Sequence, residues 1–433
     1  MTAPLPNLSI PGSTPRHRAS MFRALRHRNF QLFFGGQMIS LIGTWMQTLA
    51  QGWLVYRLTH SAALLGTVGF AGQIPVLFFG PLAGIIADRH RRHRIVIATQ
   101  VAMMCQALLM AILTLAHVIT VSEIFVLAIC LGVCNAFDIP ARQSFLVEMV
   151  GDEDLMNAIA LNSSIFNSAR IIGPAVAGVL VAALGEGMCF LINGLSFIAV
   201  IAGLLMMKVS TPRFNQEGVG KWELFREGVD YTRKNVAIRS LLILLGVVSL
   251  LGMSYMVLMP IFADKVLHSG PKGLGWLMTS TGFGALLAAL SLARRKHLLG
   301  LDRVVAWASA GFGVSLVLFG FSKSFGLSLI LLVPAGFCLM VQMASTNTLV
   351  QSMVSHTMRG RVMGLYTMMF LGVAPFGSLM AGFLAQRYGA PSAVIFGGLA
   401  CTLSASVFGL RLRHLKIDSH ITPSVSESPS DVV

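Results

Sequence analysis

The chain has 433 residues, of which 55% are hydrophobic and only 11% are charged, and its mean hydropathy is +0.75. Soluble domains carry about 25% charged residues, so this composition excludes a water-soluble protein and predicts a protein that crosses a membrane several times. The formal net charge of +15 does not indicate a nucleic-acid partner, because the basic residues form short runs between apolar segments.

Both ends of the chain are polar. Residues 1–28 are rich in Pro, Ser and Arg and lack the apolar core of a cleavable signal peptide, so we expect a cytoplasmic N-terminal tail. Residues 415–433 contain Ser, Pro and Glu and are expected to form a disordered C-terminal tail.

Twelve stretches poor in charge lie between the tails, and each is long enough for the ~20 residues that span a bilayer. They are 29–56, 58–87, 95–122, 124–146, 155–184, 187–207, 240–263, 273–293, 304–322, 324–354, 362–386 and 388–410. The predicted fold is therefore an all-α membrane protein with an N-terminal six-helix bundle at 29–209 and a C-terminal six-helix bundle at 240–414.

The linker between the bundles, 210–239, has the pattern of an amphipathic helix. Trp222, Phe225 and Val229 recur at spacings of three and four, with charged residues on the other face. We expect this helix to lie at the cytoplasmic interface, where it either tethers the bundles or has a regulatory or partner-binding role.

The basic residues also predict the orientation in the membrane. Twelve crossings place both termini on one side, and a cytoplasmic location puts 25 of the 32 Lys and Arg residues in cytoplasmic segments. Two of the others, Arg142 and Arg170, lie inside helices, and the remaining five lie on the opposite side: Arg57, Lys265, Lys272, Lys323 and Arg387.

The two bundles resemble each other at an offset of 204 residues. This shift aligns Gly173 and Gly178 of the fifth span with Gly377 and Gly382 of the eleventh, and it also aligns residues of the fourth and tenth spans. An offset that persists over two spans indicates a duplication. Repeated bundles are typical of transporters whose substrate path lies between the repeats near the bilayer midplane.

The loop after the second span carries the most specific motif, which reads Gly84-Ile85-Ile86-Ala87-Asp88-Arg89-His90-Arg91-Arg92-His93-Arg94. Together with the twelve spans, it resembles the hallmark loop of the major facilitator superfamily, with departures at Ile86, Arg91 and His93. The resemblance implies the major facilitator fold, a location in the bacterial inner membrane, and a gating motif formed by Gly84, Asp88, Arg89 and Arg92.

In this family the acid of that loop faces the start of the eleventh helix, which here begins near 359–361. Asp88 would then accept hydrogen bonds from the helix N-terminus and pair with Arg, locking the cytoplasmic end. The corresponding loop after the eighth span, 293–297, keeps the basic charge but lacks the acid, so the latch would be one-sided.

The fourth and fifth spans resemble the branch of the superfamily that contains enterobactin-exporter-like and multidrug exporters. Gly173, Pro174 and Gly178 resemble the helix-packing motif of antiporters, although Ala169 and Ala177 replace two of its usual glycines. The first span departs from many drug/proton antiporters, because it has no acid and offers only amides: Gln37, Gln47 and Gln51.

Ionisable residues inside spans are functional candidates. Asp138 and Arg142, four residues apart, would share one helix face and form either a proton-coupling site or a permanent structural pair. Arg170 is expected to face protein or a water-filled path, where it would contact a polar or anionic substrate or serve a structural role. Further candidates for the cavity are Gln47, Gln51, Asn162 and Asn167.

Other chemistry has little support in the sequence. The six cysteines lie in apolar runs without His or carboxylate partners, so no metal and no disulfide is expected, and without a Walker motif no ATP-driven pump and no cofactor is expected. The hypothesis is a secondary transporter, functional as a monomer and not an enzyme, that exports a small amphipathic compound, drug or siderophore in exchange for protons by alternating access. The alternatives are a symporter or uniporter for a polar metabolite, and a non-transporting membrane sensor.

Overall fold

The computed structural model describes residues 22–208, 221–294, 300–355 and 357–415. The expected tails at 1–21 and 416–433 therefore lie outside the described residues, as do 209–220 of the linker. Every regular element in the described ranges is a helix.

The first half of the chain contains a short 3₁₀ turn, η1 (Arg23–Arg26), and five long helices. These are α1 (Arg28–Thr59), α2 (Ala62–Arg89), α3 (Arg92–Leu115), α4 (Val121–Leu184) and α5 (Glu186–Leu205). At 1.5 Å per residue the 64 residues of α4 would extend about 96 Å, far beyond a bilayer of about 30 Å. The helix is in fact broken at Gly151, whose φ of +72° glycine adopts readily, and its two arms are separate spans.

The second half begins with the linker helix α6 (Lys221–Lys234). Its first span is interrupted by two π-helical turns and consists of α7 (Val236–Val247), η2 (Val248–Gly252), α8 (Tyr255–Ile261) and η3 (Phe262–Val266). The next three are α9 (Gly270–Ala293), α10 (Leu301–Phe321) and α11 (Phe325–Met353). The last two are α12 (Arg359–Thr367) with η4 (Met368–Gly372) and α13 (Ala374–Tyr388), and α14 (Ala390–Leu415).

The predicted fold class is confirmed. Within the described ranges, ten helices are long and apolar enough to cross a membrane. This number counts α4 once and omits α1, which is 32 residues long but less apolar. With the two arms of α4 and with α1 the chain has twelve spans.

The end of the third span differs from the prediction. We expected it to reach residue 122, but α3 ends at Leu115, and His117 adopts a left-handed conformation with φ of +59°. Thr120 and Glu123 then form a capping box, in which Thr120 N donates to Glu123 Oε2 at 2.7 Å, and α4 begins at Val121. Local capping chemistry ends the apolar run before its last uncharged residue.

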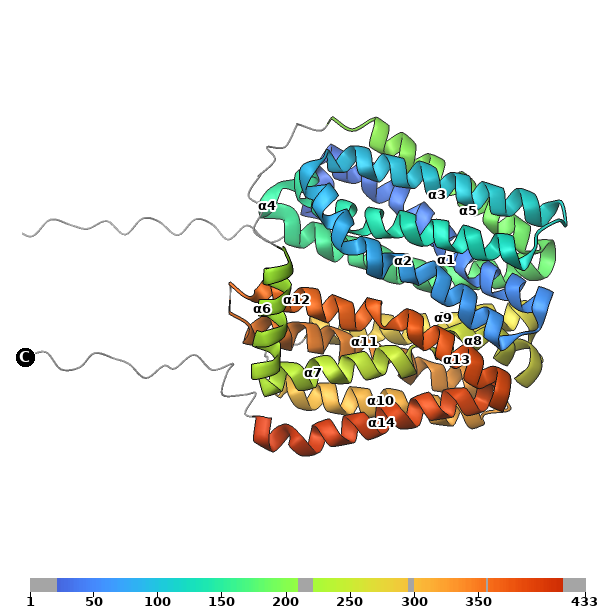
Figure 1. Ribbon diagram of the computed structural model, residues 1–433. Coiled ribbons are helices and arrows are strands. Elements are labelled where there is room, and N and C mark those ends of the chain that lie inside the picture. Colours follow the sequence, from blue (N-terminus) through green and yellow to red (C-terminus); the bar gives the residue numbers. More distant parts are fainter. Residues whose placement is uncertain (1–21, 209–220, 295–299, 356, 416–433) are drawn as a thin grey trace, which may run out of the picture.

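The helices form two groups that lie side by side, α1–α5 and α7–α14, and α6 lies across the end of the second group, beside α12 and α7 (Figure 1). The groups touch mainly through α2 against α13 and the second arm of α4 against α9. We call the end at which α6 lies the linker end and the opposite one the far end.

The two groups approach most closely near the far end. A Cβ at Gly178 would lie 2.9 Å from the Cα of Gly275, and a Cβ at Gly66 would lie 2.9 Å from the Cα of Gly382. Gly178 and Gly382 are the residues that the 204-residue offset aligns, so the duplicated glycines form equivalent crossing points. At the linker end, by contrast, a Cβ at Gly84 would meet no atom within 4 Å, so this glycine is not a crossing point.

Candidate functional site

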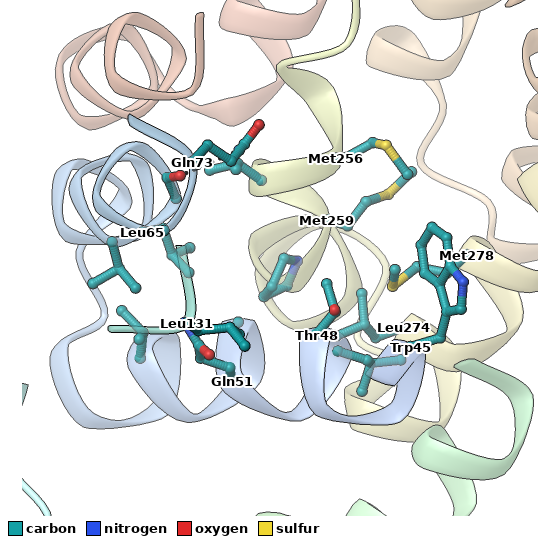
Figure 2. Close-up of a pocket in the computed structure, with 18 residues that line it drawn as sticks. Trp45, Thr48, Gln51, Leu65, Gln73, Leu131, Met256, Met259, Leu274 and Met278 are labelled. Carbon is teal, nitrogen blue, oxygen red and sulfur yellow. Dashed lines mark hydrogen bonds between the residues drawn. The ribbon is translucent and has the colours of Figure 1, made fainter. Parts of the chain in front are cut away.

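A cavity of about 350 Å³ lies between the two groups of helices (Figure 2). Trp45, Thr48 and Gln51 of α1 form one wall, and Met256 and Met259 of α8 lie opposite. Further residues come from α2, α4 and α9: Gln73, Leu131, Leu274 and Met278. This volume falls in the range of pockets for drug-sized molecules, roughly 300–1,000 Å³.

The lining of this cavity is apolar and uncharged. None of its 18 lining residues is Asp, Glu, Lys, Arg or His, and its polar groups are amides, a hydroxyl and the Trp45 indole. Met256, Met259 and Met278 place flexible, polarizable side chains against the interior. The cavity is therefore suited to a bulky apolar group of variable shape.

A smaller pocket of about 70 Å³ adjoins this cavity inside the first group. Thr48, Gln51 and Leu131 line both spaces, so the cavity and the pocket share a wall. Asp138 and Arg142 also line this pocket, and its volume has room for water. The pocket that shares a wall with the apolar cavity therefore contains an ionisable pair.

Asp138 is the acid among the residues that line this pocket, and it is 1% exposed. Its Oδ2 pairs with Arg142 Nε at 3.1 Å, and its Oδ1 accepts hydrogen bonds from Thr99 Oγ1 and Gln100 Nε2, both at 2.9 Å. Arg142 is 27% exposed at its side chain, so the pair is buried at the acid and accessible at the base. The structure brings these two candidates together within a network of α3 and α4.

Amides continue this polar network across the first group. Gln47 Nε2 donates to Gln106 Oε1 at 3.0 Å, and Asn193 Nδ2 donates to Gln47 Oε1 at 2.6 Å. Two pocket-lining oxygens, Gln37 Oε1 and Gln100 Oε1, are buried without a hydrogen-bond partner among the described residues. Buried acceptors of this kind are costly unless a donor such as water reaches them.

The remaining cavity candidates lie elsewhere. Asn162 and Asn167 line neither of the two pockets, and Asn167 Nδ2 donates locally to Ser163 O at 2.8 Å. Arg170 also lines neither pocket, but its half-buried side chain lies between the groups, where its charge acts on Tyr255 of α8. Gln47 and Gln51 are thus the two of these five candidates that reach a pocket wall.

The glycine and proline residues of the fifth span pack against two neighbours. A Cβ at Gly173 would lie 2.5 Å from Trp45 Cβ of α1. A Cβ at Gly178 would instead lie 3.0 Å from Pro271 O of α9. Pro174 lies within α4, and its carbonyl lies against Gly275 of α9. Small residues here let three backbones approach one another.

The gating motif lies at the linker end of α2 and α3. Arg89 is exposed, and Arg92 pairs with Glu148 of α4 through Nη1 at 2.9 Å and donates to Ala87 O at 3.3 Å. The side chain of Asp88 lies outside the described part of the structure. Across the gap, Arg361 of α12 pairs with Glu227 of α6, so the linker helix contacts the expected latch partner.

Polar contacts join the two groups at the far end. Tyr56 Oη donates to Asp264 Oδ2 at 2.9 Å. Gln386 Oε1 of α13 accepts from Ala62 N at 2.9 Å and from Ser61 Oγ at 3.2 Å, and so caps the start of α2. Together with the glycine crossings, these bonds close the far end.

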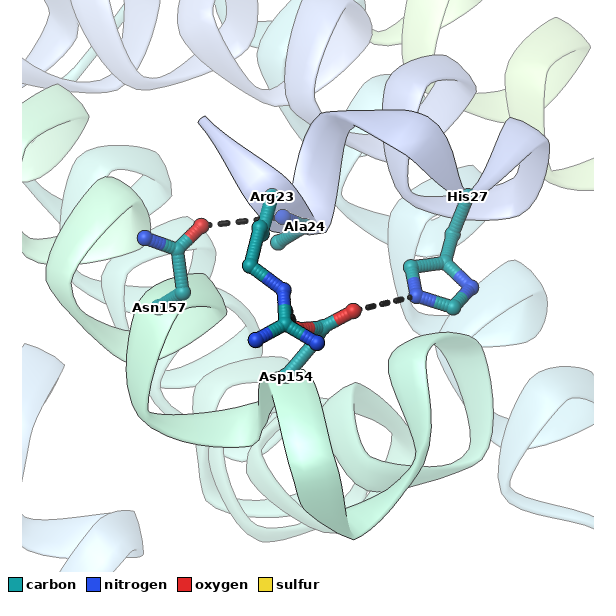
Figure 3. Close-up of polar contacts among 5 residues, drawn as sticks. All are labelled: Arg23, Ala24, His27, Asp154 and Asn157. Atoms are coloured by element: carbon teal, nitrogen blue, oxygen red, sulfur yellow. Dashed lines mark hydrogen bonds and ion pairs between the residues drawn. The ribbon is translucent and has the colours of Figure 1, made fainter. Parts of the chain in front are cut away.

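A further polar cluster fastens the start of the described chain (Figure 3). Asp154 of α4 pairs with Arg23 Nε at 3.1 Å and with His27 Nε2 at 2.9 Å. Asn157 Oδ1 accepts from Ala24 N at 2.9 Å. Residues 22–28 of the expected tail are thus held against the linker end of α4.

No group of three or more His, Cys, Asp or Glu residues that could hold a metal occurs in the described ranges. Sequence reasoning missed Trp45, Gln73, Tyr255, Gln100 and Asp154, because their roles depend on contacts between distant helices. The sequence contains 24 Met residues, and their number does not distinguish the three that line the cavity from the others.

Comparison with known proteins agrees with this geometry. A family model described as transmembrane secretion effector, a major facilitator family, matches residues 19–432. The chain is similar to the staphyloferrin A transporter of Staphylococcus aureus, at 26% identity over 89% of this chain and 96% of the relative. It is also similar to the multidrug efflux pump Tap of Mycolicibacterium fortuitum, at 25% identity over 87% and 94%, and to macrolide efflux protein A of Streptococcus pyogenes, at 23% over 83% and 90%.

Solved structures show the same fold. A POT family transporter aligns with a TM-score of 0.72 at 10% identity, covering 90% of this chain and 96% of that one. A bacterial homologue of the human lysosomal transporter Spinster, inward-facing and unoccupied, aligns with a TM-score of 0.66 at 12% identity, covering 95% and 98%. The expectation of a transporter, and not of an enzyme, is confirmed by the family match and the relatives.

Proposed function

The chain belongs to the transmembrane secretion effector family of major facilitator transporters, and from that premise we propose that it exports a small amphipathic compound by alternating access in exchange for protons. The linker end is cytoplasmic and the far end faces outward, in line with the distribution of Lys and Arg. The membrane in this proposal is the bacterial inner membrane, and the working unit is a monomer.

The observation that carries this proposal is the wall shared by the two pockets. A substrate in the apolar cavity lies against Thr48 and Gln51, and the same two residues line the space that leads to Asp138. A change in cavity occupancy can therefore alter the surroundings of the carboxyl. Arg142 is the charged partner of this carboxyl at 3.1 Å, so a movement that separates the two residues would change the charge balance at the place where we locate proton exchange.

The relatives support export as the direction and define the range of cargo. Two are named for drug or macrolide efflux and one for transport of a siderophore. The closed far end fits a state that would load cargo from the cytoplasm. Rocking of the groups about the glycine crossings would then open the far end.

The test uses the purified chain in proteoliposomes with a radiolabelled macrolide as the probe. Wild-type protein should accumulate the macrolide when a pH gradient is imposed, and it should also exchange it without a gradient. Asp138→Asn should lose gradient-driven accumulation and retain exchange. Asp152→Asn, an exposed acid of the same end, serves as the control and should behave as wild type. Gradient-driven accumulation by Asp138→Asn would contradict the coupling assignment, and loss of both activities would assign Asp138 to structure.

A further inference from the structure

Arg170 occupies a position between the two groups of helices, away from lipid. Its carbonyl oxygen lies against Gly282 of α9, 3.0 Å from where a Cβ would stand, and the next carbonyl, that of Ile171, accepts a hydrogen bond from Thr279 Oγ1 at 3.2 Å. One turn further along α4, Gly173 packs against Trp45 of α1. The residue is therefore surrounded by helices of both halves.

The guanidinium of Arg170 has no acceptor. Among the described residues it forms no ion pair and no hydrogen bond, and its one electrostatic neighbour is Tyr255. Four other arginines, by contrast, have carboxylate partners within the protein: Arg57 with Glu186, Arg92 with Glu148, Arg142 with Asp138 and Arg361 with Glu227. An unpaired guanidinium with five donors deep in a membrane protein requires a counter-ion.

Tyr255 adds a second donor at the same place. The residue is 2% exposed, and its hydroxyl has no partner that meets hydrogen-bond geometry. The hydroxyl of Thr281 lies near it, but Thr281 Oγ1 donates to Leu277 O at 3.3 Å. The Tyr255 ring packs edge-on against Phe312, with 6.2 Å between the ring centroids.

This pair of donors lies close to residues of the apolar cavity, although neither Arg170 nor Tyr255 lines it. Tyr255 directly precedes Met256, and Thr279, which bonds beside Arg170, directly follows Met278; both methionines line the cavity. Because no charged residue lines the cavity itself, Arg170 and Tyr255 supply charge and polarity at its edge. The two residues come from opposite halves of the molecule, Arg170 from α4 and Tyr255 from α8.

We propose that the preferred cargo is an amphipathic organic acid whose carboxylate, or a comparable oxyanion, binds between Arg170 and Tyr255 while its apolar body fills the methionine-lined cavity. This inference rests on the proposed function and specifies its substrate class. A charge-assisted contact to the guanidinium provides affinity, and the phenol donates to the second oxygen. Since the anion joins both halves, its presence at this site also couples substrate binding to the movement between them.

The experiment measures binding, not transport, on the purified full chain in nanodiscs at pH 7.5. The probes share one apolar body and differ in the head group: 2-naphthylacetate, 2-naphthylacetamide and 2-(2-naphthyl)ethylamine. We expect the acid to bind about tenfold tighter than the amide and the amine. Arg170→Gln and Tyr255→Phe should each weaken acid binding to the level of the amide and leave amide binding within about twofold.

The controls separate recognition from folding. Tyr366→Phe removes a hydroxyl that donates to Met343 O elsewhere in the same half, and it should keep the preference for the acid. Arg170→Lys keeps the charge but not the planar fork, so it should retain part of the preference. Equal binding of acid and amide by wild type, no measurable binding of the acid, or equal weakening of both probes by Tyr255→Phe would each overturn the proposal.

These outcomes are distinct from those of the coupling test. A chain that still exports a macrolide under a pH gradient but shows no preference for the acid would retain the proposed function and refute the substrate class. A chain that prefers the acid through Arg170 and Tyr255 but drives no transport would refute the export proposal itself.

Discussion

Tyr56, near the end of α1, donates a hydrogen bond of 2.9 Å to Asp264, a residue of the other half of the molecule. It is a side-chain bond across the far end, and Gln386 adds a second connection by capping the start of α2. The far end is therefore closed by polar contacts as well as by glycine packing. Opening it requires that these bonds break together.

Removing the Tyr56 hydroxyl should favour opening of the far end. A hydrogen bond to a charged group contributes about 1.5–3 kcal/mol, so Tyr56→Phe should raise the open-to-closed ratio at least about tenfold. The measurement is the distance distribution between nitroxide labels on Leu58 and Lys323, exposed residues at the far end of opposite halves. Tyr388→Phe, an exposed tyrosine at the same end, is the control, and equal distributions for both variants would contradict the role of the bond.

A bulky side chain at the crossing of α4 and α9 should prevent closure. A Cβ at Gly178 already comes within 2.9 Å of the Cα of Gly275, so Gly178→Leu must separate the helices. Transport of the labelled macrolide should fall by about tenfold or more while the protein still reaches the membrane. Gly326→Leu, where no atom lies within 4 Å, should be tolerated; similar activity of the two variants would show that the crossing is not needed.

Much of the fold is predictable from the sequence, because the bilayer sets the length of each span. The twelve spans follow from composition. The equivalent packing of Gly178 and Gly382 follows from the repeat, which aligns the two glycines. The end of α3 was wrong by several residues, because an uncharged run does not show where a left-handed His117 and a capping box stop a helix.

The site is less predictable, for physical reasons. The pairing of Asp138 with Arg142 follows from a spacing of four on one helix. Tyr255 and Arg170 are 85 residues apart and belong to different halves, so no local pattern relates them. Asn162 and Asn167 were predicted to line the cavity from residue type alone, and neither residue lines a pocket.

Loss of the Asp154 charge should release the N-terminal segment. Asp154 holds Arg23 and His27 at 3.1 and 2.9 Å, and its side chain is only 13% exposed (Figure 3). Asp154→Asn should increase the rate of tryptic cleavage after Arg23 and Arg26 by about fivefold, in line with the loss of about 1 kcal/mol. Asp152→Asn should leave this rate unchanged. Unaltered cleavage of the Asp154 variant would mean that the Asn157 bond alone suffices.

Asp88 of the gating motif and Glu227 of the linker helix are expected to compete for Arg361. In this structure Arg361, near the start of α12, pairs with Glu227 of the linker helix, and a Cβ at Gly84 or Gly360 would meet no atom within 4 Å. Neither glycine is therefore packed against a neighbouring helix in this state. For the linker end to close, the loop at Asp88 must approach α12, and Arg361 can then exchange one carboxylate for another.

Asp88→Asn should therefore slow transport much more than Glu227→Gln does. Exposed ion pairs contribute about 0–1 kcal/mol, and the Glu227 side chain is 55% exposed, so its loss should change transport by about fivefold at most. In the proposed closed state Asp88 would face a helix N-terminus and an arginine, so with Asp88→Asn macrolide transport should fall by about tenfold or more at equal membrane levels. The double variant should resemble Asp88→Asn if the two acids use Arg361 in turn. If Glu227→Gln were the more damaging substitution, the linker pair, and not the Asp88 loop, would hold the linker end.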